Sequence, residues 1–131
     1  MKYAIIGAGG TGGILGFYMT KAGKDVTLIA RGRHLAAMQE KGCRGEMWDG
    51  TTEIIPVKAM DMEHYVEQPD VVLVCVKGYS LEDTIPFYSA RGEAFHHRDP
   101  GVKHLRNRCE NAGAVAKASG DGRLYLCLCQ Y

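Results

Sequence analysis

The first 30 residues contain a glycine-rich turn that lies between a buried strand and a helix. KYAIIG is a short apolar run ending at a glycine, which predicts a strand over Lys2–Ile6. GAGGTG follows, with Gly7, Gly9 and Gly12 in the spacing G-x-G-x-x-G. Apolar residues then recur at helical spacing, and DVTLIA predicts a second strand over residues 25–30. This order of strand, turn, helix and strand predicts an α/β fold with a parallel sheet.

Each glycine of this motif has its own physical purpose. Gly7 permits a tight turn off the strand, Gly9 lets a pyrophosphate approach the backbone, and Gly12 lets the helix pack close to the strand. The phosphates would lie at the helix N-terminus, where N–H groups and the helix dipole favour anions. The candidate phosphate-binding residues are therefore Gly7, Ala8, Gly9, Gly10, Thr11 and Gly12. The alternative, a glycine-rich turn without a ligand, is disfavoured by the position of the motif between a strand and a helix.

The end of the second strand indicates which dinucleotide is bound. NAD-binding proteins usually place an acidic residue there, on the ribose 2′-hydroxyl. Here the chain reads IARGRH, so Ala30 is followed by Arg31 and, two residues on, Arg33. A guanidinium fits a 2′-phosphate by charge and by bidentate geometry. The sequence therefore favours NADP, with Arg31 the better candidate because it is nearer the strand end. A solvated surface arginine is the alternative for both.

A third buried strand places a lysine at the same edge of the predicted sheet. DVVLVCVK predicts a strand over residues 71–76, and its continuous apolar character fits a parallel sheet covered on both faces. Lys77 follows at the carboxyl end, where open α/β sheets bind their ligands. It could contact the nicotinamide ribose or the substrate, or it could be a solvated lysine. SLEDTIPF predicts a helix beginning at Ser80, with Asp83 in a capping-box position.

The segment between the second and third strands is rich in β-forming residues. HLAAMQEKG predicts a short helix ending at Gly42, and the pair Asp49-Gly50 in the next segment predicts a hairpin turn. We expect Trp48 and Ile55 to pack in this hairpin. His64 lies in a polar connection and is expected at the surface.

The composition changes near residue 88. Residues 1–87 carry 9 Lys and Arg and 11 Asp and Glu, a net charge of −2, whereas residues 88–131 carry 7 and 4, a net charge of +3. The second part has no Ile and few other core-forming residues, so we divide the chain into a domain over 1–87 and an atypical tail over 88–131 that is disordered or loosely structured.

The net charge, the lengths of the apolar runs and the number of cysteines exclude several classes of protein. The net charge of the whole chain is +1, which gives no reason to expect a nucleic-acid partner. No signal peptide is recognisable, and no apolar run is long enough to span a membrane. Five cysteines, an odd number, form no disulfide framework, so we expect a cytoplasmic protein with reduced thiols.

The first 87 residues resemble the ketopantoate reductase (2-dehydropantoate 2-reductase) family. The glycine motif is shared by many dehydrogenases, but LIARGRHL and VCVKGYSLED are more specific. The resemblance implies a Rossmann-type parallel sheet, the cofactor NADP(H), and reduction of a 2-oxo acid to a 2-hydroxy acid in pantothenate biosynthesis. It also implies that the glycine loop binds phosphate, that Arg31 binds the 2′-phosphate and that Lys77 contacts the cofactor.

The same resemblance implies that the catalytic residues lie outside this sequence. The general-acid lysine and a substrate-binding glutamate of the family belong to a helical C-terminal domain that we expect to be absent here, so no catalytic residue is assigned. The chain is expected to be a truncated, catalytically incomplete form of the enzyme. The alternative is a non-catalytic module that binds or senses NADP.

The tail has three competing interpretations: a zinc site, an RNA-binding segment and an out-of-frame translation. Its histidines and cysteines could ligate zinc, but their spacing matches no standard finger, and its basic residues form no stripe with interleaved aromatics for RNA. The residues considered as zinc ligands are His96, His97, His104, Cys109, Cys127 and Cys129. Degenerate codons for DPGVKHLRNR and DGRLYLCLC, read one nucleotide out of frame, permit two segments typical of the family. We therefore interpret the tail as an out-of-frame translation and assign no metal site, and resequencing the DNA near codons 87 and 88 tests this interpretation.

Overall fold

The computed structural model describes residues 1–77, 79–84 and 87 in full, and the backbone alone of Gly78 and of two further strands, residues 114–118 and 124–128. In this part of the chain six strands form one sheet in the order β5-β2-β1-β6-β8-β7, and two more form a separate hairpin. The strands are β1 (Lys2–Ile6), β2 (Asp25–Ile29), β3 (Cys43–Glu46), β4 (Thr52–Ile55), β5 (Lys58–Met60), β6 (Val71–Val74), β7 (Ala114–Ala118) and β8 (Leu124–Leu128). The helices are α1 (Gly10–Lys21) and α2 (Gly32–Lys41), with 3-10 turns η1 (Gly78–Ser80) and η2 (Glu82–Thr84).

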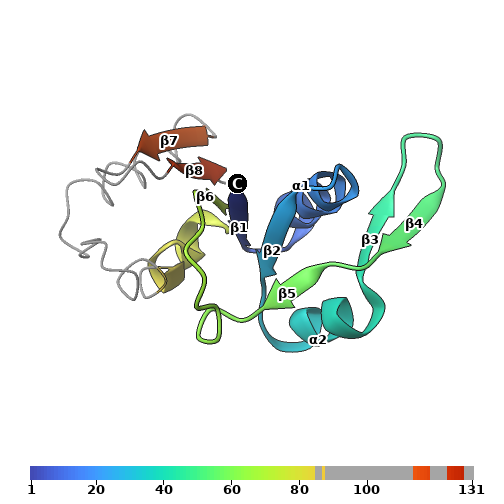
Figure 1. The fold of residues 1–131 in the computed structure, drawn as a ribbon, viewed down its shortest axis with the longest axis horizontal. Helices are drawn as coiled ribbons and strands as arrows, with labels where there is room; N and C mark the ends of the chain where they lie inside the picture. The colour runs from blue at the N-terminus through green and yellow to red at the C-terminus, as the bar shows by residue number, and fades with distance from the viewer. Residues whose placement is uncertain (85–86, 88–113, 119–123, 129–131) are drawn as a thin grey trace.

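The central strands are parallel. Strand β1 pairs with β2 on one side and with β6 on the other, β2 pairs with β5, and β6 pairs with β8, all in parallel register. Only the outermost pair of this sheet, β7 and β8, is antiparallel. The predicted α/β fold with a parallel, Rossmann-type sheet is therefore confirmed. Figure 1 shows the β3–β4 hairpin standing apart from this sheet.

Both faces of the sheet are buried, because side chains of a strand alternate between its faces. On one face, residues of β1, β2 and β6 pack with Tyr65, Leu81 and Phe87. On the other face, the alternate residues of the same strands pack with Phe17 of α1, Met38 of α2 and other apolar side chains. The two clusters separate neighbouring residues such as Ala4 and Ile5, both fully buried. This arrangement explains the continuous apolar character of the central strands.

The predicted elements of the first 60 residues are confirmed, with small changes at their ends. Strand β1 has the predicted bounds, and β2 ends one residue earlier than predicted. Helix α1 ends at Lys21, shortly before Gly23, which has a φ of 74°. Helix α2 ends before Gly42, whose φ is 86°. Glycine adopts this left-handed backbone without steric cost, so both glycines stop their helices, and Gly42 does so as predicted.

The hairpin forms where the sequence predicts it, but one expectation about its packing is wrong. Strands β3 and β4 pair antiparallel around Asp49-Gly50, and the Met47 N–H donates to the Thr51 carbonyl at 2.7 Å. Ile55 packs partly against the core, as expected. Trp48 is 97% exposed and does not pack. It lies in the turn of the hairpin, where its side chain is left in solvent.

The segment after β6 also differs from the prediction. Strand β6 ends at Val74, although the Cys75 N–H still donates to the Ile6 carbonyl at 2.7 Å. Over residues 78–84 the structure has the turns η1 and η2 in place of an α-helix beginning at Ser80. The Thr84 hydroxyl donates to the Leu81 carbonyl at 2.6 Å, a local bond that closes the second turn.

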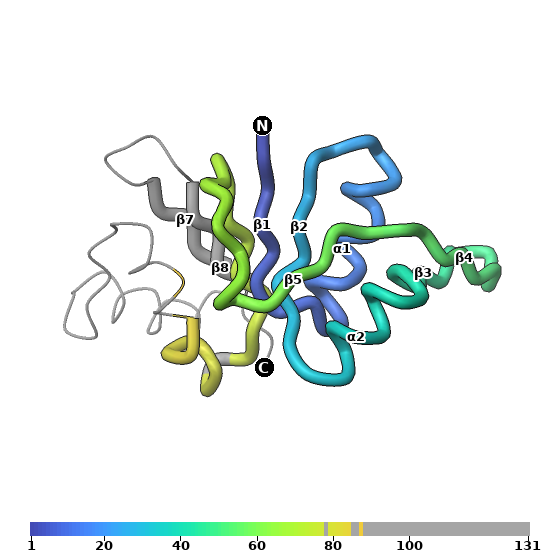
Figure 2. The backbone as a smooth tube through the Cα atoms, turned by 60° about the horizontal axis from the view of Figure 1, so that its bottom comes forward, coloured from blue at the N-terminus to red at the C-terminus, as the bar shows by residue number. Residues whose placement is uncertain are grey.

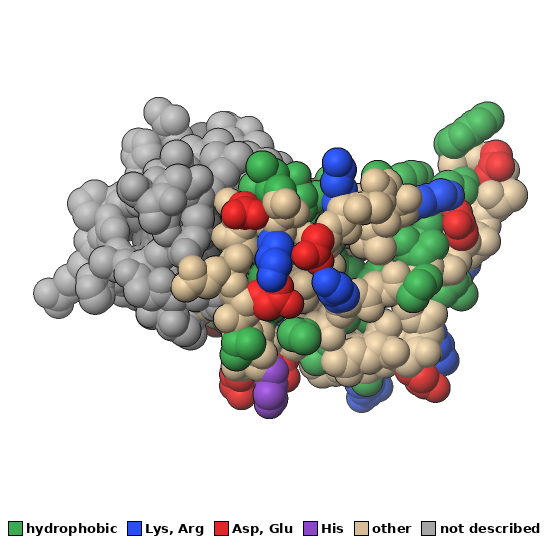
Figure 3. All heavy atoms as spheres, viewed as in Figure 1, with side chains coloured by type: hydrophobic (Ala, Val, Ile, Leu, Met, Phe, Trp, Pro, Cys, Tyr) green, Lys and Arg blue, Asp and Glu red, His purple; other side chains and the backbone are tan. Residues whose placement is uncertain are grey.

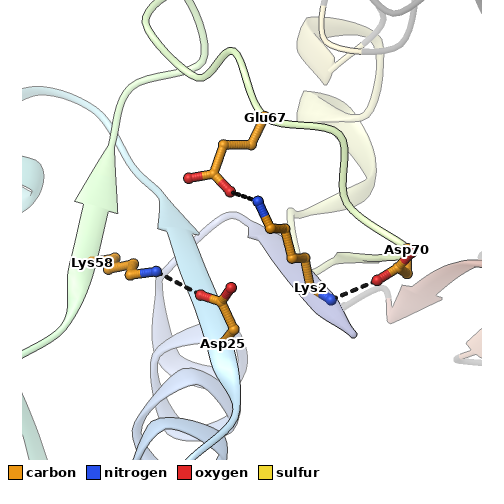
Figure 4. A network of polar contacts seen from close by, with 5 residues as sticks. All are labelled: Lys2, Asp25, Lys58, Glu67 and Asp70. Carbon is orange, nitrogen blue, oxygen red and sulfur yellow. Dashed lines mark hydrogen bonds and ion pairs between the residues drawn. The ribbon is translucent and has the colours of Figure 1, made fainter.

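The amino edge of the sheet carries paired charges. Lys2 Nζ lies 2.8 Å from Glu67, and the Lys2 backbone N–H donates to the Asp70 carboxylate at 2.6 Å. Lys58 Nζ, at the start of β5, lies 2.6 Å from Asp25, at the start of β2 (Figure 4). Figure 3 shows acidic and basic side chains interleaved over the sheet. These exposed pairs lie at the amino ends of the strands, whereas the candidate cofactor-binding residues follow the carboxyl ends.

The tail contributes backbone pairing to the sheet. Strand β8 lies beside β6 from Val71 to Val74, and β7 lies outside it. The division of the chain at residues 87 and 88 and the out-of-frame interpretation stay predictions. The rest of residues 88–131, including HHRDPGVKHLRNR, lies outside the described residues, as do the side chains of both tail strands. Among the described residues, no helix is both long and apolar enough to cross a membrane.

Candidate functional site

The glycine loop lies at the carboxyl edge of the sheet, between β1 and α1. Figure 2 shows β1 running from the N-terminus down to this loop, and β2 running in the same direction to the turn before α2. Gly7 has a φ of 88°, and its N–H donates to the Ile29 carbonyl at 3.1 Å. A Cβ atom at Gly7 would lie 2.7 Å from Val76 Cγ1. The loop is therefore held between the ends of β2 and β6.

Gly9 and Gly12 have different surroundings, and that of Gly12 shows the predicted close packing of the helix. A Cβ atom at Gly12 would lie 2.1 Å from the Gly7 carbonyl oxygen, so only glycine permits the observed packing of α1 against the loop. A Cβ atom at Gly9 would meet nothing within 4 Å. The backbone at Gly9 therefore faces open space, which is what a pyrophosphate would require.

The first turn of α1 is suited to an anion. Gly9 is its N-cap and has no side chain to accept from the N–H groups of that turn, and no acidic residue lies there. The Gly13 N–H makes the first bond of the helix, to the Gly9 carbonyl at 2.7 Å. The first N–H groups of a helix have no acceptor within it, and the dipole adds partial positive charge there. Bound phosphate would supply acceptors for them.

Arg31 lies directly after β2 and precedes α2. Its side chain is 81% exposed and its guanidinium lies 3.7 Å from the carboxylate of Asp83, in η2. The residue between the strand and Arg31 is Ala30, so the strand end carries no carboxylate for a ribose 2′-hydroxyl. Arg33 is exposed on the first turn of α2. The guanidinium of Arg31 thus lies at the carboxyl edge of the sheet, as the glycine loop does, and is open to solvent.

Lys77 is exposed and lies at the same edge of the sheet. It follows Val76, whose side chain lies against Gly7. The Lys77 carbonyl accepts a hydrogen bond from the Ser80 N–H at 2.8 Å, which closes η1. The structure therefore brings three predicted features, the glycine loop, Arg31 and Lys77, to the carboxyl ends of neighbouring strands. This is the edge at which open α/β sheets bind ligands.

One residue at this edge was missed by the sequence analysis. His34, on the first turn of α2, has its Nε2 atom 2.5 Å from the Ala8 carbonyl oxygen in the glycine loop. A carbonyl oxygen only accepts hydrogen bonds, so Nε2 is the donor. The two residues are 26 positions apart in the sequence, and no local spacing signals their contact.

The described residues hold no group of three or more His, Cys, Asp or Glu placed to bind a metal ion. The tail residues considered above as zinc ligands have side chains outside this part of the chain. Cys43 is buried beside α1, and burial raises the pKa of its thiol. Since a thiol must ionise to act as a nucleophile, Cys43 is a core residue. Cys75 is buried as well.

The parallel sheet, with a glycine loop and a short strand-to-helix connection at its carboxyl edge, places the chain among Rossmann-type α/β proteins. More narrowly, the chain belongs to the ketopantoate reductase PanE/ApbA family, whose sequence pattern matches residues 3–129. A 2-dehydropantoate 2-reductase of Pyrococcus horikoshii is 35% identical over 121 residues, which are 92% of this chain and 37% of that protein.

Solved structures agree with the fold. The crystal structure of a PanE/ApbA family ketopantoate reductase from Ralstonia eutropha matches with a TM-score of 0.61 and 36% identity, over 66% of this chain and 29% of that one. D-mandelate dehydrogenase, solved with NADH and anilino(oxo)acetate, matches with a TM-score of 0.66 and 20% identity, over 99% and 46%. The chain spans 37% and 25% of the length of two curated relatives that it matches.

Proposed function

We propose that this chain binds NADP(H) at the carboxyl edge of its sheet and is the cofactor-binding region of a 2-dehydropantoate 2-reductase. The observation that supports this most directly is the pairing of two features at one edge. An open glycine loop leads into a helix without acidic residues in its first turn, and the neighbouring strand is followed by Arg31 where NAD-binding proteins usually place a carboxylate.

Each proposed contact follows from the chemistry of the residue. The loop from Gly7 to Gly12 binds the pyrophosphate through backbone N–H groups. Arg31 binds the 2′-phosphate, and its exposure lets the guanidinium reach it. Lys77 contacts the nicotinamide ribose or the substrate. The bound cofactor would supply the hydride that reduces the 2-oxo group.

We propose the substrate as a 2-oxo acid, 2-dehydropantoate, which the reaction would convert to pantoate. None of the residues assigned here is a general acid for the developing alkoxide, and we propose that the residues performing that step lie outside residues 1–131. A non-catalytic NADP-binding or sensing module is the second candidate. It would need only the proposed NADP-binding residues, the glycine loop and Arg31, and no general acid.

A binding titration tests the cofactor proposal. We expect the 131-residue chain to bind NADPH more tightly than NADH, and Arg31→Ala to lower NADPH affinity about 10- to 100-fold, the usual effect of losing a charge-assisted hydrogen bond. Affinity for NADH should stay close to its original value. Arg33→Ala is the matched control, because Arg33 is an exposed arginine two residues away. Equal affinity for both dinucleotides would contradict the assignment of Arg31, and absence of binding would contradict the site.

Turnover is measured separately, by following NADPH absorbance in the presence of ketopantoate. Oxidation of NADPH coupled to pantoate formation would show that the chain contains a complete reductase site, against our expectation. Binding without turnover agrees with both a catalytically incomplete reductase and a sensing module. An intact reading frame in the DNA of several isolates would then favour the sensing module.

A further inference from the structure

The contact between His34 and the glycine loop has a geometric consequence for the loop. Ala8 is 3% exposed. The first hydrogen bond of α1 is accepted by the Gly9 carbonyl, so the Ala8 carbonyl lies one residue before the first carbonyl bonded within the helix. A buried carbonyl needs a hydrogen-bond partner, and the Nε2–H of His34 supplies one to Ala8. Both neutral and protonated imidazole can donate from this atom.

This hydrogen bond controls the direction of one loop amide. A trans peptide is planar, so the Ala8 carbonyl and the Gly9 N–H point in opposite directions. Drawing the carbonyl toward α2 directs the Gly9 N–H away from α2. Glycine offers little resistance to rotation of this peptide, since it has no Cβ to clash. The hydrogen bond from His34 therefore opposes a flip of the Ala8–Gly9 peptide.

We propose that His34 is a positioning residue that fixes the Ala8–Gly9 peptide for phosphate binding and couples the glycine loop to the segment carrying Arg31. His34 lies three residues after Arg31, on the first turn of α2. One hydrogen bond thus joins the proposed pyrophosphate site to the proposed 2′-phosphate site. This inference rests on the proposed function for its ligand, but the hydrogen bond and its effect on the loop exist without a ligand.

Two amide substitutions separate this bond from the other properties of His34. His34→Gln places an amide nitrogen the same number of bonds from Cα as Nε2, so it can still donate to the Ala8 carbonyl. His34→Asn carries the same amide one bond closer to the backbone and cannot reach. His34 is exposed, so neither change opens a core cavity. His64→Asn, at an exposed histidine that pairs with Asp61, is the matched control.

Two measurements on the full 131-residue chain decide the proposal. The first is hydrogen–deuterium exchange of the loop amides without ligand, where His34→Asn should exchange about 3- to 10-fold faster, as expected for one lost hydrogen bond. The second is NADPH affinity, which should fall about 3- to 10-fold in His34→Asn. In both, His34→Gln should restore the original behaviour, and His64→Asn should match the unaltered chain.

The outcomes distinguish the inference from the proposed function. Loop exchange and NADPH affinity that are unchanged in His34→Asn, or equally altered in His34→Gln and His34→Asn, would overturn the role of His34. If the unaltered chain fails to bind NADPH, the proposed function fails instead. Loop exchange in the ligand-free chain then decides by itself whether His34 fixes the peptide. A general loss of folding would appear as faster exchange throughout β1 and β6, and His34→Gln would not correct it.

Discussion

Arg31 and Asp83 form an ion pair of 3.7 Å that joins the end of β2 to the η2 turn beyond β6. Both side chains are largely exposed, at 81% and 59%, so the pair itself stabilises the fold by less than ~1 kcal/mol. The ion pair matters because it involves Arg31, the residue proposed to bind the 2′-phosphate. A phosphate bound to Arg31 would compete with the Asp83 carboxylate for the guanidinium and would be repelled by it.

Replacing Asp83 should therefore strengthen NADPH binding. We expect Asp83→Asn to raise NADPH affinity about 2- to 5-fold at low ionic strength, in keeping with the small free energy of an exposed pair, and to change NADH affinity less. Fluorescence titration at two salt concentrations measures this, and the gain should shrink at high salt. Glu82→Gln, a neutralised acidic neighbour, is the control. Weaker NADPH binding in Asp83→Asn would show that Asp83 orients Arg31 instead of competing for it.

Alanine substitutions at two loop glycines should separate stability from NADPH binding. Gly12→Ala brings a Cβ atom to 2.1 Å from the Gly7 carbonyl oxygen, so the packing of α1 must shift and the free energy of unfolding should fall by ~1–3 kcal/mol. Gly9→Ala meets no atom within 4 Å and should leave stability within ~0.5 kcal/mol. Its methyl group would instead occupy the proposed pyrophosphate position and weaken NADPH binding.

Thermal melts and NADPH titrations of both variants check this pair. Gly9→Ala should melt like the unaltered chain, and Gly12→Ala should melt at a lower temperature. Unchanged NADPH affinity in a stable Gly9→Ala variant would place the pyrophosphate elsewhere.

The sequence predicted the central strands and both helices, because their signals are local. Strands β1 and β6 are apolar runs, and Gly23 and Gly42 stop their helices through their own backbone freedom. The glycine loop was predicted for the same reason. The contact between His34 and Ala8 could not be predicted, since it joins residues far apart in the sequence.

Two local expectations failed because tertiary surroundings decide them. Trp48 was expected to pack in the hairpin, but a turn residue packs only if another element lies against it, and Trp48 is 97% exposed. Asp83 was expected to cap a helix beginning at Ser80. The structure has 3-10 turns there, and the Asp83 carboxylate lies beside Arg31. No sequence spacing reveals this partner, which comes from another strand end.

The exposure of Trp48 gives a simple optical prediction. Trp48 is the only tryptophan of the chain and is 97% exposed. Its emission should resemble that of tryptophan in water, acrylamide should quench it efficiently, and urea should change it little. Circular dichroism should report a clear unfolding transition in the same samples. A blue-shifted, poorly quenched emission would show that the hairpin tip is covered in solution.

The charged pairs at the amino edge of the sheet predict that the stability of the fold falls with pH in the acidic range. The hydrogen bond from Lys58 lowers the pKa of Asp25 below its ordinary value. A carboxylate with a lowered pKa stabilises the fold above its unfolded pKa of about 3.9, and that stability is lost as pH falls through the folded pKa. Urea midpoints between about pH 6 and pH 2 should therefore fall less steeply in Asp25→Asn than in the unaltered chain.

The control for this measurement is Glu40→Gln, at an exposed position on α2 that takes no part in the ion pairs of Lys2 and Lys58 at the amino edge. It should leave the acid dependence close to that of the unaltered chain. High salt should reduce the difference between Asp25→Asn and the unaltered chain, because Lys58 and Asp25 are both exposed to solvent (Figure 4). Lys58→Met, which removes the partner, should flatten the acid dependence in the same direction as Asp25→Asn. A steeper loss of stability in either variant would contradict the lowered pKa of Asp25.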